Sequence, residues 1–556
     1  MPTLVQRAAS NSVIIDEELG LDFQKIMSEN DKNITPFMKL FWEQQQKSFG
    51  KGTTVRYHPM IIRFCLSLAS KSASSYDELR SSNVLTLPSR RTLRDYKNAI
   101  KPEAGFNPAV IQELIKVATP LNDYQRYIVL SFDEMKIDKN LVYDKYSGQL
   151  TGYVDLGDPD VNYSSFKDQN DLATHVLAYY VRGLASDLKF ELGYFGTKDV
   201  TAHQIMLTFW RAVAILEDTC QLPVIATVSD GASSNRAFYR MHSMLHQSID
   251  SDIEVVHRTI NLYARERYIC FFADVPHLMK TTRNCIYHSG SGKTRYLWND
   301  GKDSLWSHIS KIVCDESNCG LKLISKLHEE HVRLNPYSKM NVRLAVQVLS
   351  QSVSNILYGY YPSDTHGTAE LCKYMDTFFD CLNVRNRVEG KHKKKEFLFP
   401  YEDENDLRFS WLLNKFLPYL KQWKASIESR QGNFLKKDKS NMFLSYQTYE
   451  GILITVHSVI QAVQFLLKTG MKFVLTERFN QDVLEENFGR HRSIGRRNEN
   501  PSLYQFGYDS NTIRMQRSIA PVRGNTKGGH NQKRLVSWSI VDEAPLPKRN
   551  SKSDQY

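Results

Sequence analysis

The sequence predicts an α/β fold in which a mixed sheet is interrupted by a large helical insertion and preceded by a small helical domain. Three observations lead to this prediction: short apolar runs typical of strands between residues 127 and 274, a long helical pattern in 284–472, and a basic helical segment near residue 90. The chain has 556 residues, 41% of them hydrophobic and 24% charged, a globular composition that excludes wholesale disorder and coiled coil.

The net charge of +11 comes from two parts of the chain. Residues 51–100 and 514–556 each contain nine Lys or Arg against three Asp or Glu, so the remainder is close to neutral. This distribution is typical of a protein that binds nucleic acid. A solvated surface and a solubilising tail would explain the charge alone equally well.

The composition also indicates the cellular compartment in which the protein works. The eight cysteines form no Cys-x-x-Cys pair, which argues against a disulfide framework and a zinc finger. The N-terminal residues lack the apolar core of a signal peptide, and no uninterrupted apolar run reaches the ~18 residues of a membrane span. We therefore expect a cytosolic or nuclear protein without a membrane partner.

Residues 51–115 predict a helix-turn-helix-like DNA-binding domain, after a segment 1–50 that we expect to be partly helical or disordered. Apolar residues recur at helical spacing in Tyr57–Ser70, Ser74 could cap a second helix, and Ser89 could cap a third. The third helix would carry the basic side chains of Arg90, Arg91, Arg94 and Lys97. Such a helix could enter the major groove of DNA, although small helical domains without a DNA role are as common.

Residues 120–296 predict the first part of a catalytic α/β domain. The expected elements, in chain order, are strand 127–133, a hairpin of 141–143 and 152–156, strand 174–182, helix 200–216, strand 223–231, a helix from 233 and strand 268–273. Asp133 ends the first strand and Asp230 the fourth. This order, with acids at those two strand ends, is the layout of an RNase H-like sheet.

Neighbouring central strands would place Asp133 and Asp230 side by side, where carboxylates could hold Mg²⁺ for phosphoryl transfer by two metal ions. A single acid after a strand is more often a turn or cap residue, but two in this order favour a metal site. A third carboxylate must come from a helix, and residues 475–488 have the required apolar spacing. Asp482 and Glu485 lie on one side of that helix.

Basic side chains follow the acidic helix directly: Arg490, His491, Arg492, Arg496 and Arg497. A cluster in this place could bind the DNA backbone beside a metal site. The alternative is a solvated helix end, where cations interact favourably with the helix dipole.

Residues 297–470 predict an inserted helical domain, because a connection of this length is too long for a loop. The expected helices are 306–312, 321–331, 340–358, 368–382, 407–426 and 448–469. Residues 471–520 would then complete the RNase H-like domain, and residues 521–556 would form a disordered basic tail.

Four motifs resemble those of the P-element-type transposases. They are SFDEMKIDKNLVYDKYSGQLTGYVDLGD (131–158), VSDGASSNRAFY (228–239), FFADVPHLMKTTRN (271–284) and NQDVLEENFGRHRSIGRRNENP (480–501). The window 56–97 is similar to the helix-turn-helix of the same family. The family's zinc-coordinating THAP module is not expected here, because residues 1–50 contain no cysteine.

The resemblance implies a DDE transposase in which Asp133, Asp230 and Glu485 bind two catalytic Mg²⁺ ions, or Mn²⁺, with Asp482 as an accessory candidate. Metal-activated water would cleave the DNA at transposon ends, and the freed 3′-hydroxyl would attack target DNA. The partners would be transposon-end and target DNA in the nucleus. Joining two ends implies a homo-oligomer on DNA.

The resemblance also identifies the insertion as a GTP-binding domain. Its nucleotide-contacting residues would be Lys326, Val342, Ser350, Asp380 and Asn383. Position 341 is Asn where the family leads us to expect Lys. A helical insertion that only braces DNA is the alternative.

Three functions follow as hypotheses. The first is a P-element-like DDE DNA transposase that depends on Mg²⁺ and is assisted by GTP. The second is a domesticated, non-catalytic DNA-binding protein derived from such an enzyme, using residues 51–100 and the tail. The third is a guanine-nucleotide-binding switch.

Overall fold

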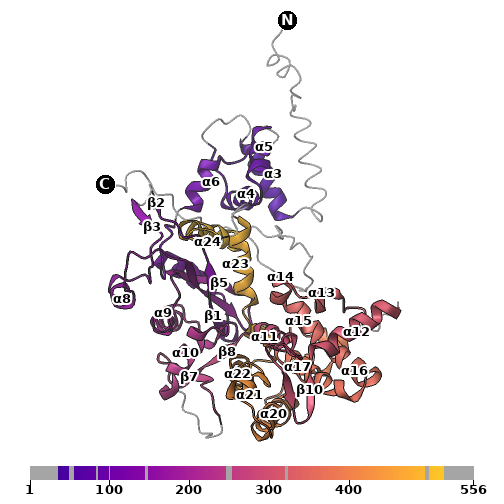
Figure 1. The fold of residues 1–556 in the computed structure, drawn as a ribbon. Helices are drawn as coiled ribbons and strands as arrows, with labels where there is room; N and C mark the ends of the chain where they lie inside the picture. The colour runs from indigo at the N-terminus through magenta and orange to yellow at the C-terminus, as the bar shows by residue number, and fades with distance from the viewer. Residues whose placement is uncertain are drawn as a thin grey trace. The chain divides into compact units, whose positions relative to one another are not determined.

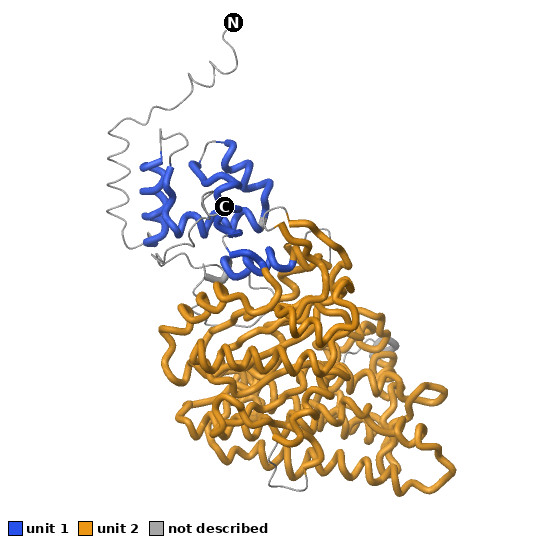
Figure 2. Tube along the Cα trace, turned by 90° about the vertical axis from the view of Figure 1, so that its left-hand side faces the viewer, with its two compact units in different colours: residues 1–102, 506–556 blue, residues 103–505 orange. Residues whose placement is uncertain are grey.

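The computed structural model describes residues 35–48, 55–82, 85–98, 100–144, 148–245, 253–319, 324–494 and 500–518 (Figure 1). The chain forms two compact units, one of residues 1–102 with 506–556 and one of residues 103–505 (Figure 2). The segments 1–34 and 519–556, for which disorder was expected in part, lie outside the described residues.

The first unit is helical and has its own core. Its described helices are α3 (Pro36–Ser48), α4 (Pro59–Lys71), α5 (Ala73–Ser81), α6 (Arg90–Lys97) and most of α24 (Leu503–Ser518). Ile61, Cys65, Tyr76 and Leu93 are buried together in the core. The hydroxyl of Ser89 accepts a hydrogen bond from the backbone N–H of Thr92, so Ser89 caps α6 as the sequence predicts.

Helix α5, the second of the three helices predicted from the sequence, begins earlier than expected. Its N-cap is Ser72, whose hydroxyl accepts from the backbone N–H of Ser75, and the predicted cap Ser74 lies inside α5. Tyr76 then fixes the entry to α6, because its buried hydroxyl donates to the carbonyl oxygen of Pro88 over 2.7 Å.

A six-stranded mixed sheet forms the centre of the second unit, with strand order β5-β4-β1-β6-β8-β7. The strands are β1 (Ile128–Lys136), β4 (His175–Gly183), β5 (Lys189–Thr197), β6 (Val224–Ser229), β7 (Arg258–Ile260) and β8 (Tyr268–Ala273). Strands β1, β6 and β8 are parallel, whereas β4, β5 and β7 pair antiparallel with their neighbours. The predicted mixed α/β sheet is therefore confirmed.

Two strands of this sheet were not predicted, and one predicted hairpin lies outside it. The glycines of β5 argue against a strand in the sequence, but Gly193 and Gly196 lie where a side chain would meet the carbonyl oxygens of Gly105 and Tyr153, at 2.6 and 2.8 Å. The hairpin forms a separate small sheet of β2 (Val142–Asp144) and β3 (Gln149–Thr151), so its second strand lies before the predicted 152–156. Tyr143 and Leu150 are exposed there, so the apolar residues of this hairpin do not join the core.

Helices flank the sheet: α9 (Ala202–Ala214) packs against α10 (Ser233–Met241), and α22 (Tyr446–Lys468) packs against β8 (Figure 1). By length and composition α22 could cross a membrane, but 72% of its most apolar window is buried within the protein. It serves here as a core helix that packs on β8 and α11.

The insertion is helical, as expected, but two of the expected helices, 340–358 and 407–426, are each divided into shorter ones. Its helices run from α11 (Val275–Tyr287) through α12 (Trp306–Cys319), α13 (Glu329–Val332), α14 (Pro336–Met340), α15 (Val342–Val348), α16 (Gln351–Tyr360), α17 (His366–Leu382), α18 (Glu389–Lys393), α19 (Leu407–Trp411), α20 (Leu417–Ser429) and α21 (Lys436–Asn441) to α22. The expected helix 340–358 is broken because the side chains of Asn341 and Ser350 cap α15 and α16. The chain returns to the sheet through a short helical turn at Thr476–Phe479 and α23 (Asp482–Ile494).

We expect Gly193→Ala to destabilise the second unit, because its methyl group would lie 2.6 Å from the carbonyl oxygen of Gly105 and 2.7 Å from Phe106 Cδ1. The free energy of unfolding, measured by urea denaturation, should fall by about 1–3 kcal/mol. The control is Gly359→Ala in α16, where no atom lies within 4 Å of the added methyl group. There the helix should gain about 0.5–1 kcal/mol. Equal effects of the two substitutions would contradict the close approach of β5 to Gly105.

Candidate active site

Acidic side chains lie along one edge of the sheet on adjacent parallel strands. Ser131 of β1 pairs with Val228 of β6, and Ser229 pairs with Ala273 of β8. Asp133, Asp230 and Asp274 therefore follow one another across this end of the sheet, which we call the acidic edge. Strand β1 continues to Lys136, so Asp133 lies inside the strand rather than at its end, where β1 extends beyond its pairing with β6.

The surroundings of the Asp133 carboxyl group shift its pKa strongly. Burial raises its pKa well above the usual value, and the negative charges of Asp230, Glu485 and Asp274 raise it further. One hydrogen bond, from the backbone N–H of Glu134 at 2.8 Å, acts in the opposite direction. A cation bound beside Asp133 would offset the repulsion from the neighbouring carboxylates and favour the ionised form of this acid.

The Asp230 side chain is held on one oxygen only. Its Oδ1 accepts hydrogen bonds from the backbone N–H of Ala232 at 2.9 Å and from Asn235 Nδ2 at 2.7 Å. No hydrogen bond from the described chain reaches Oδ2. Both contacts come from the start of α10, so this helix orients the carboxylate.

Asp133 and Asp230 line a common cavity of about 170 Å³ together with Glu134, His175 and Asn235. Carboxylates that share a cavity with water and a substrate phosphate match the way in which Mg²⁺ is bound in phosphoryl-transfer enzymes. Within the described ranges, no three His, Cys, Asp or Glu side chains converge closely enough to hold a metal ion by themselves. The chemistry of the oxygen donors Asp133 and Asp230 fits a hard divalent cation such as Mg²⁺.

Glu134 was not predicted as a site residue. Burial raises its pKa, and its Oε1 accepts a hydrogen bond from Thr197 Oγ1 at 2.6 Å. Its position directly after Asp133 could have suggested a place in the site. Side chains alternate along a strand, however, so the sequence suggests that Glu134 and Asp133 lie on opposite faces of the sheet.

The start of α23 is joined to the strand edge by Gln481. Its backbone N–H donates to Asp274 Oδ1 at 3.0 Å, and its side-chain Nε2 donates to the carbonyl oxygen of Phe132 at 2.9 Å. Asp274 Oδ2 accepts from the backbone N–H of His277 at 2.9 Å and caps α11. Burial raises the pKa of Asp274 to about 7, and the charges of Asp482 and Glu485 contribute. Glu485 itself is exposed on α23.

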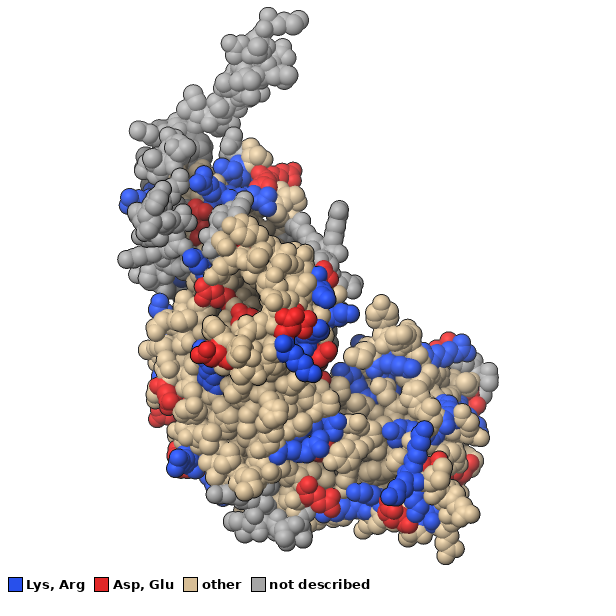
Figure 3. All heavy atoms as spheres, turned by 60° about the vertical axis from the view of Figure 1, so that its left-hand side comes forward, with Lys and Arg blue, Asp and Glu red and all other residues tan. Residues whose placement is uncertain are grey.

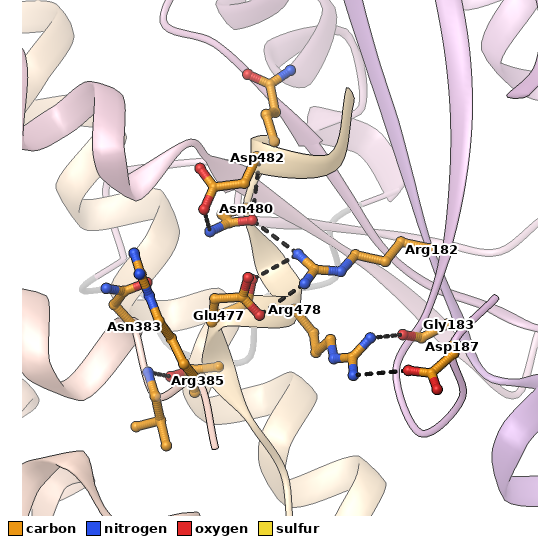
Figure 4. Close-up of polar contacts among 12 residues, drawn as sticks. Arg182, Gly183, Asp187, Asn383, Arg385, Glu477, Arg478, Asn480 and Asp482 are labelled. Atoms are coloured by element: carbon orange, nitrogen blue, oxygen red, sulfur yellow. Dashed lines mark hydrogen bonds and ion pairs between the residues drawn. The ribbon is translucent and has the colours of Figure 1, made fainter. Parts of the chain in front are cut away.

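Asp482 belongs to a different group of contacts, which Figure 4 shows. Its Oδ2 accepts a hydrogen bond from Asn480 Nδ2 at 3.0 Å, and Asn480 Oδ1 accepts from Arg182 Nη1 at 2.9 Å. Arg182 Nη2 also forms an ion pair with Glu477 Oε2 at 2.7 Å. The charge of Glu485 raises the pKa of Asp133, whereas Asp482 is not among the groups that do so.

The basic side chains after Glu485 differ in their surroundings. Arg490 pairs with Glu486 at 2.7 Å, Arg492 is exposed, and Arg496 and Arg497 lie outside the described residues. His491 is fully buried and contacts Glu191 Oε2 at 3.2 Å, so it does not belong to a solvated cluster.

On α6, Arg91 and Arg94 are exposed, and Arg90 pairs with Asp77 at 3.0 Å. Lys97 is half-buried: burial lowers its pKa, and the charge of Asp509 opposes this change. On the face that Figure 3 draws, the Lys and Arg side chains of the described residues lie in separate patches, and Asp or Glu side chains lie beside several of them.

The expected nucleotide-contacting residues fall into two groups. Lys326 is exposed, Val342 begins α15, and the Ser350 hydroxyl accepts from the backbone N–H of Val353 as the cap of α16. Asp380 and Asn383 lie together at the end of α17. In the described part of the chain, no hydrogen bond or ion pair joins the two groups.

Lys395 and Asp376, which the sequence did not suggest, are neighbours of Asp380. Lys395 Nζ lies 2.6 Å from Asp380 Oδ2 and 2.7 Å from Asp376 Oδ2. Burial and the charge of Asp376 raise the pKa of Asp380 to about 6, and Lys395 offsets part of this rise.

Two protein families match this chain. The family described as TNP-like, RNase H N-terminal domain matches residues 102–243, and the TNP-like, GTP-binding insertion domain matches residues 276–395. The first match covers Asp133 and Asp230, and the second covers the nucleotide-contacting candidates.

Similar proteins include the Transposable element P transposase of Drosophila melanogaster, 24% identical over 490 residues, which are 84% of this chain and 56% of the relative. The DNA transposase THAP9 of Homo sapiens is 22% identical over 473 residues, 83% of this chain and 48% of the relative. The chain thus spans about half the length of the curated relatives that it matches.

The solved Drosophila P element transposase strand transfer complex shares the fold, with a TM-score of 0.67 and 20% identity over 90% of this chain and 98% of that one. The fold, the two domain families and the relatives agree with each other. Each comparison finds this chain similar to P-element-type transposases or to domains of TNP-like proteins.

Proposed function

We propose that this protein is a DDE-type DNA transposase that cleaves DNA at transposon ends and transfers the strands to target DNA in the nucleus. The observation that carries the proposal is the arrangement of Asp133 and Asp230 in one cavity, with the charge of Glu485 acting on Asp133. Both relatives are transposases by name.

Asp133, Asp230 and Glu485 would hold the divalent metal ions, Mg²⁺ or Mn²⁺. Such ions, when bound, activate water and stabilise negative charge on the attacking and leaving oxygens of a phosphodiester. The protein's own contribution is to orient the carboxylates: Asn235 and Ala232 fix Asp230, and Gln481 fixes the start of the helix that carries Glu485. Asp482 is an accessory candidate at most, since Asn480 and Arg182 surround it.

DNA would be bound through basic groups outside the acidic edge. The candidates are Arg90, Arg91, Arg94 and Lys97 on α6, and Arg490, Arg492, Arg496 and Arg497 at and after the end of α23. The exposed members can reach phosphates directly, whereas Lys97 is half-buried and is a weaker candidate. Because two transposon ends must be joined, we propose a homo-oligomer on DNA.

GTP is the proposed second ligand. Asp380 and Asn383, at the end of α17, offer an acceptor and an amide to a guanine edge, while Lys326, Val342 and Ser350 would contact the rest of the nucleotide. The match to a GTP-binding insertion family supports this assignment. A non-catalytic DNA-binding descendant is the alternative function, and the catalytic test below separates the two.

Asp133→Asn should reduce DNA cleavage and strand transfer by a factor on the order of 10³, because a charged group at the reacting centre is lost. Supplied DNA ends and a gel-based cleavage assay measure the effect. DNA binding should persist, with its dependence on salt unchanged. Asp171→Asn, which removes an exposed acid paired with Lys198, is the matched control and should cleave normally. Cleavage by Asp133→Asn at the control rate would favour the non-catalytic alternative.

The Mg²⁺ requirement should rise as the pH falls. The pKa of Asp133 is raised, so protons compete with the metal at a higher pH than at an ordinary aspartate. We expect Mg²⁺ to increase the melting temperature at pH 8 and to have less effect near pH 5. Differential scanning fluorimetry measures both. A pH-independent increase, or an equal increase in Asp230→Asn, would contradict metal binding at these carboxylates.

Asp380→Asn should weaken GTP binding by about tenfold or more if its carboxylate accepts hydrogen bonds from guanine. ATP affinity should change little, because adenine offers a different edge. Isothermal titration calorimetry with both nucleotides tests this, with the exposed Glu428→Gln as a control for charge. Parallel losses of GTP and ATP affinity would place Asp380 away from the base.

A further inference from the structure

Three charged side chains meet near the end of helix α17 in the insertion: Asp376, Asp380 and Lys395. The two acids are four positions apart and so lie on the same face of α17. Lys395 follows α18, and its backbone N–H donates to the carbonyl oxygen of Gly390 at 3.1 Å. Its Nζ lies 2.7 Å from Asp376 Oδ2 and 2.6 Å from Asp380 Oδ2. One ammonium group therefore bridges two carboxylates.

The bridge neutralises only part of the negative charge of the two acids. The side chains of Asp376 and Asp380 are 10% and 13% exposed, so water screens their mutual repulsion poorly. Like charges four positions apart destabilise a helix, and Lys395 offsets this effect. Two carboxylates and one ammonium group still leave a net charge of −1 on the cluster when both acids are ionised.

The protonation of Asp380 depends on the balance between these charges. Burial and the charge of Asp376 raise the pKa of Asp380 to about 6, whereas Lys395 and, more weakly, Lys393 on α18 lower it. The neighbouring Cys381 thiol stays neutral, because burial raises its pKa. Lys395 contacts Oδ2 of Asp380, and within the described residues no hydrogen bond or ion pair reaches Oδ1. Oδ1 is therefore available as an acceptor for a ligand.

The protonation state of Asp380 also determines which purine it can bind. An ionised carboxylate offers two acceptor oxygens, which match the neighbouring N1–H and N2–H donors of guanine. Oδ2 can accept from Lys395 and from a base at the same time, because each carboxylate oxygen has two lone pairs. A protonated carboxyl group offers one donor and one acceptor instead, which match N1 and the N6 amino group of adenine.

We propose that Lys395 is a positioning residue for nucleotide specificity: it holds Asp380 ionised and bridged to Asp376, and so favours a guanine over an adenine nucleotide. This inference rests on the proposed GTP site and adds the residue that sets its base preference. A lysine with a structural role alone needs one carboxylate, as Lys393 has in Glu389 at 2.7 Å. The second acid, Asp376, brings the pKa of Asp380 close to neutral, where Lys395 can decide its protonation.

The test is Lys395→Met in the full chain, with GTP and ATP affinities measured by isothermal titration calorimetry from about pH 5 to about pH 8. The ratio of the two affinities cancels the titration of the triphosphate, which both nucleotides share. In the wild type the ratio should fall as the pH decreases through about 6, because Asp380 becomes protonated. Without the lysine the fall should begin at higher pH. Near pH 7 the ratio should therefore be lower by about tenfold or more, with no loss of ATP affinity.

Three variants serve as controls. Lys395→Arg keeps the charge and should keep the wild-type profile. Asp376→Asn removes the charge that raises the pKa of Asp380, so its profile should shift to lower pH. Lys302→Met, in an exposed pair with Glu370 elsewhere in the insertion, should leave the profile unchanged. In the Asp380→Asn background, where this side chain cannot titrate, Lys395→Met should not change the ratio further.

A wild-type profile in Lys395→Met would make the lysine structural and overturn the proposal. A further loss in the Asp380→Asn background would mean that Lys395 binds the nucleotide directly, and would overturn it equally. If Lys395→Met does not fold, an unshifted profile of Asp376→Asn is the contradicting result. Equal GTP and ATP affinities of the wild-type protein at about pH 8 would instead refute the proposed GTP site itself.

Discussion

The architecture of the second unit depends on the contacts of Gln481 with Asp274 and Phe132. One oxygen of Asp274 caps the first helix of the insertion, and the other accepts the backbone N–H of Gln481, where the chain returns to the sheet. The Gln481 side chain binds the carbonyl oxygen of the residue before Asp133. A single buried carboxylate therefore closes the insertion at both ends. It also sets where α23, and with it Glu485, meets the strands.

This closure has an electrostatic cost. Burial raises the pKa of Asp133 and of Asp274, and the charge of Glu485 raises the pKa of both further. The hydrogen bonds to Asp230 and Asp274 come from backbone and amide groups, which orient the carboxylates without neutralising them. Uptake of a proton or a bound cation would relax this charge distribution. A bound cation is what the proposed metal site would supply.

The sequence predicted the features that depend on local pattern. The runs that end near Asp133 and Asp230 were recognisable as strands, and Ser89 was recognisable as a cap, because those signals lie within a few residues. Strand β5 was missed because Gly193 weakens its pattern and is explained only by contact with Gly105. The role of Asp274 could not be predicted, since its partner Gln481 is 207 positions away. His491 and Lys97 looked exposed because basic residues usually are, and only the fold reveals their acidic neighbours.

A second set of long-range contacts connects the proposed GTP site with the acidic edge. Val384, directly after Asn383, donates its backbone N–H to Thr476 Oγ1 at 3.1 Å, and its carbonyl oxygen accepts the backbone N–H of Glu477 at 3.2 Å. Glu477 pairs with Arg182 of β4, and the helical turn leads within a few residues to Gln481. Backbone contacts therefore hold the end of α17 against this turn. Because Gln481 sets the start of α23, a short series of contacts joins the proposed GTP site to the helix that carries Glu485.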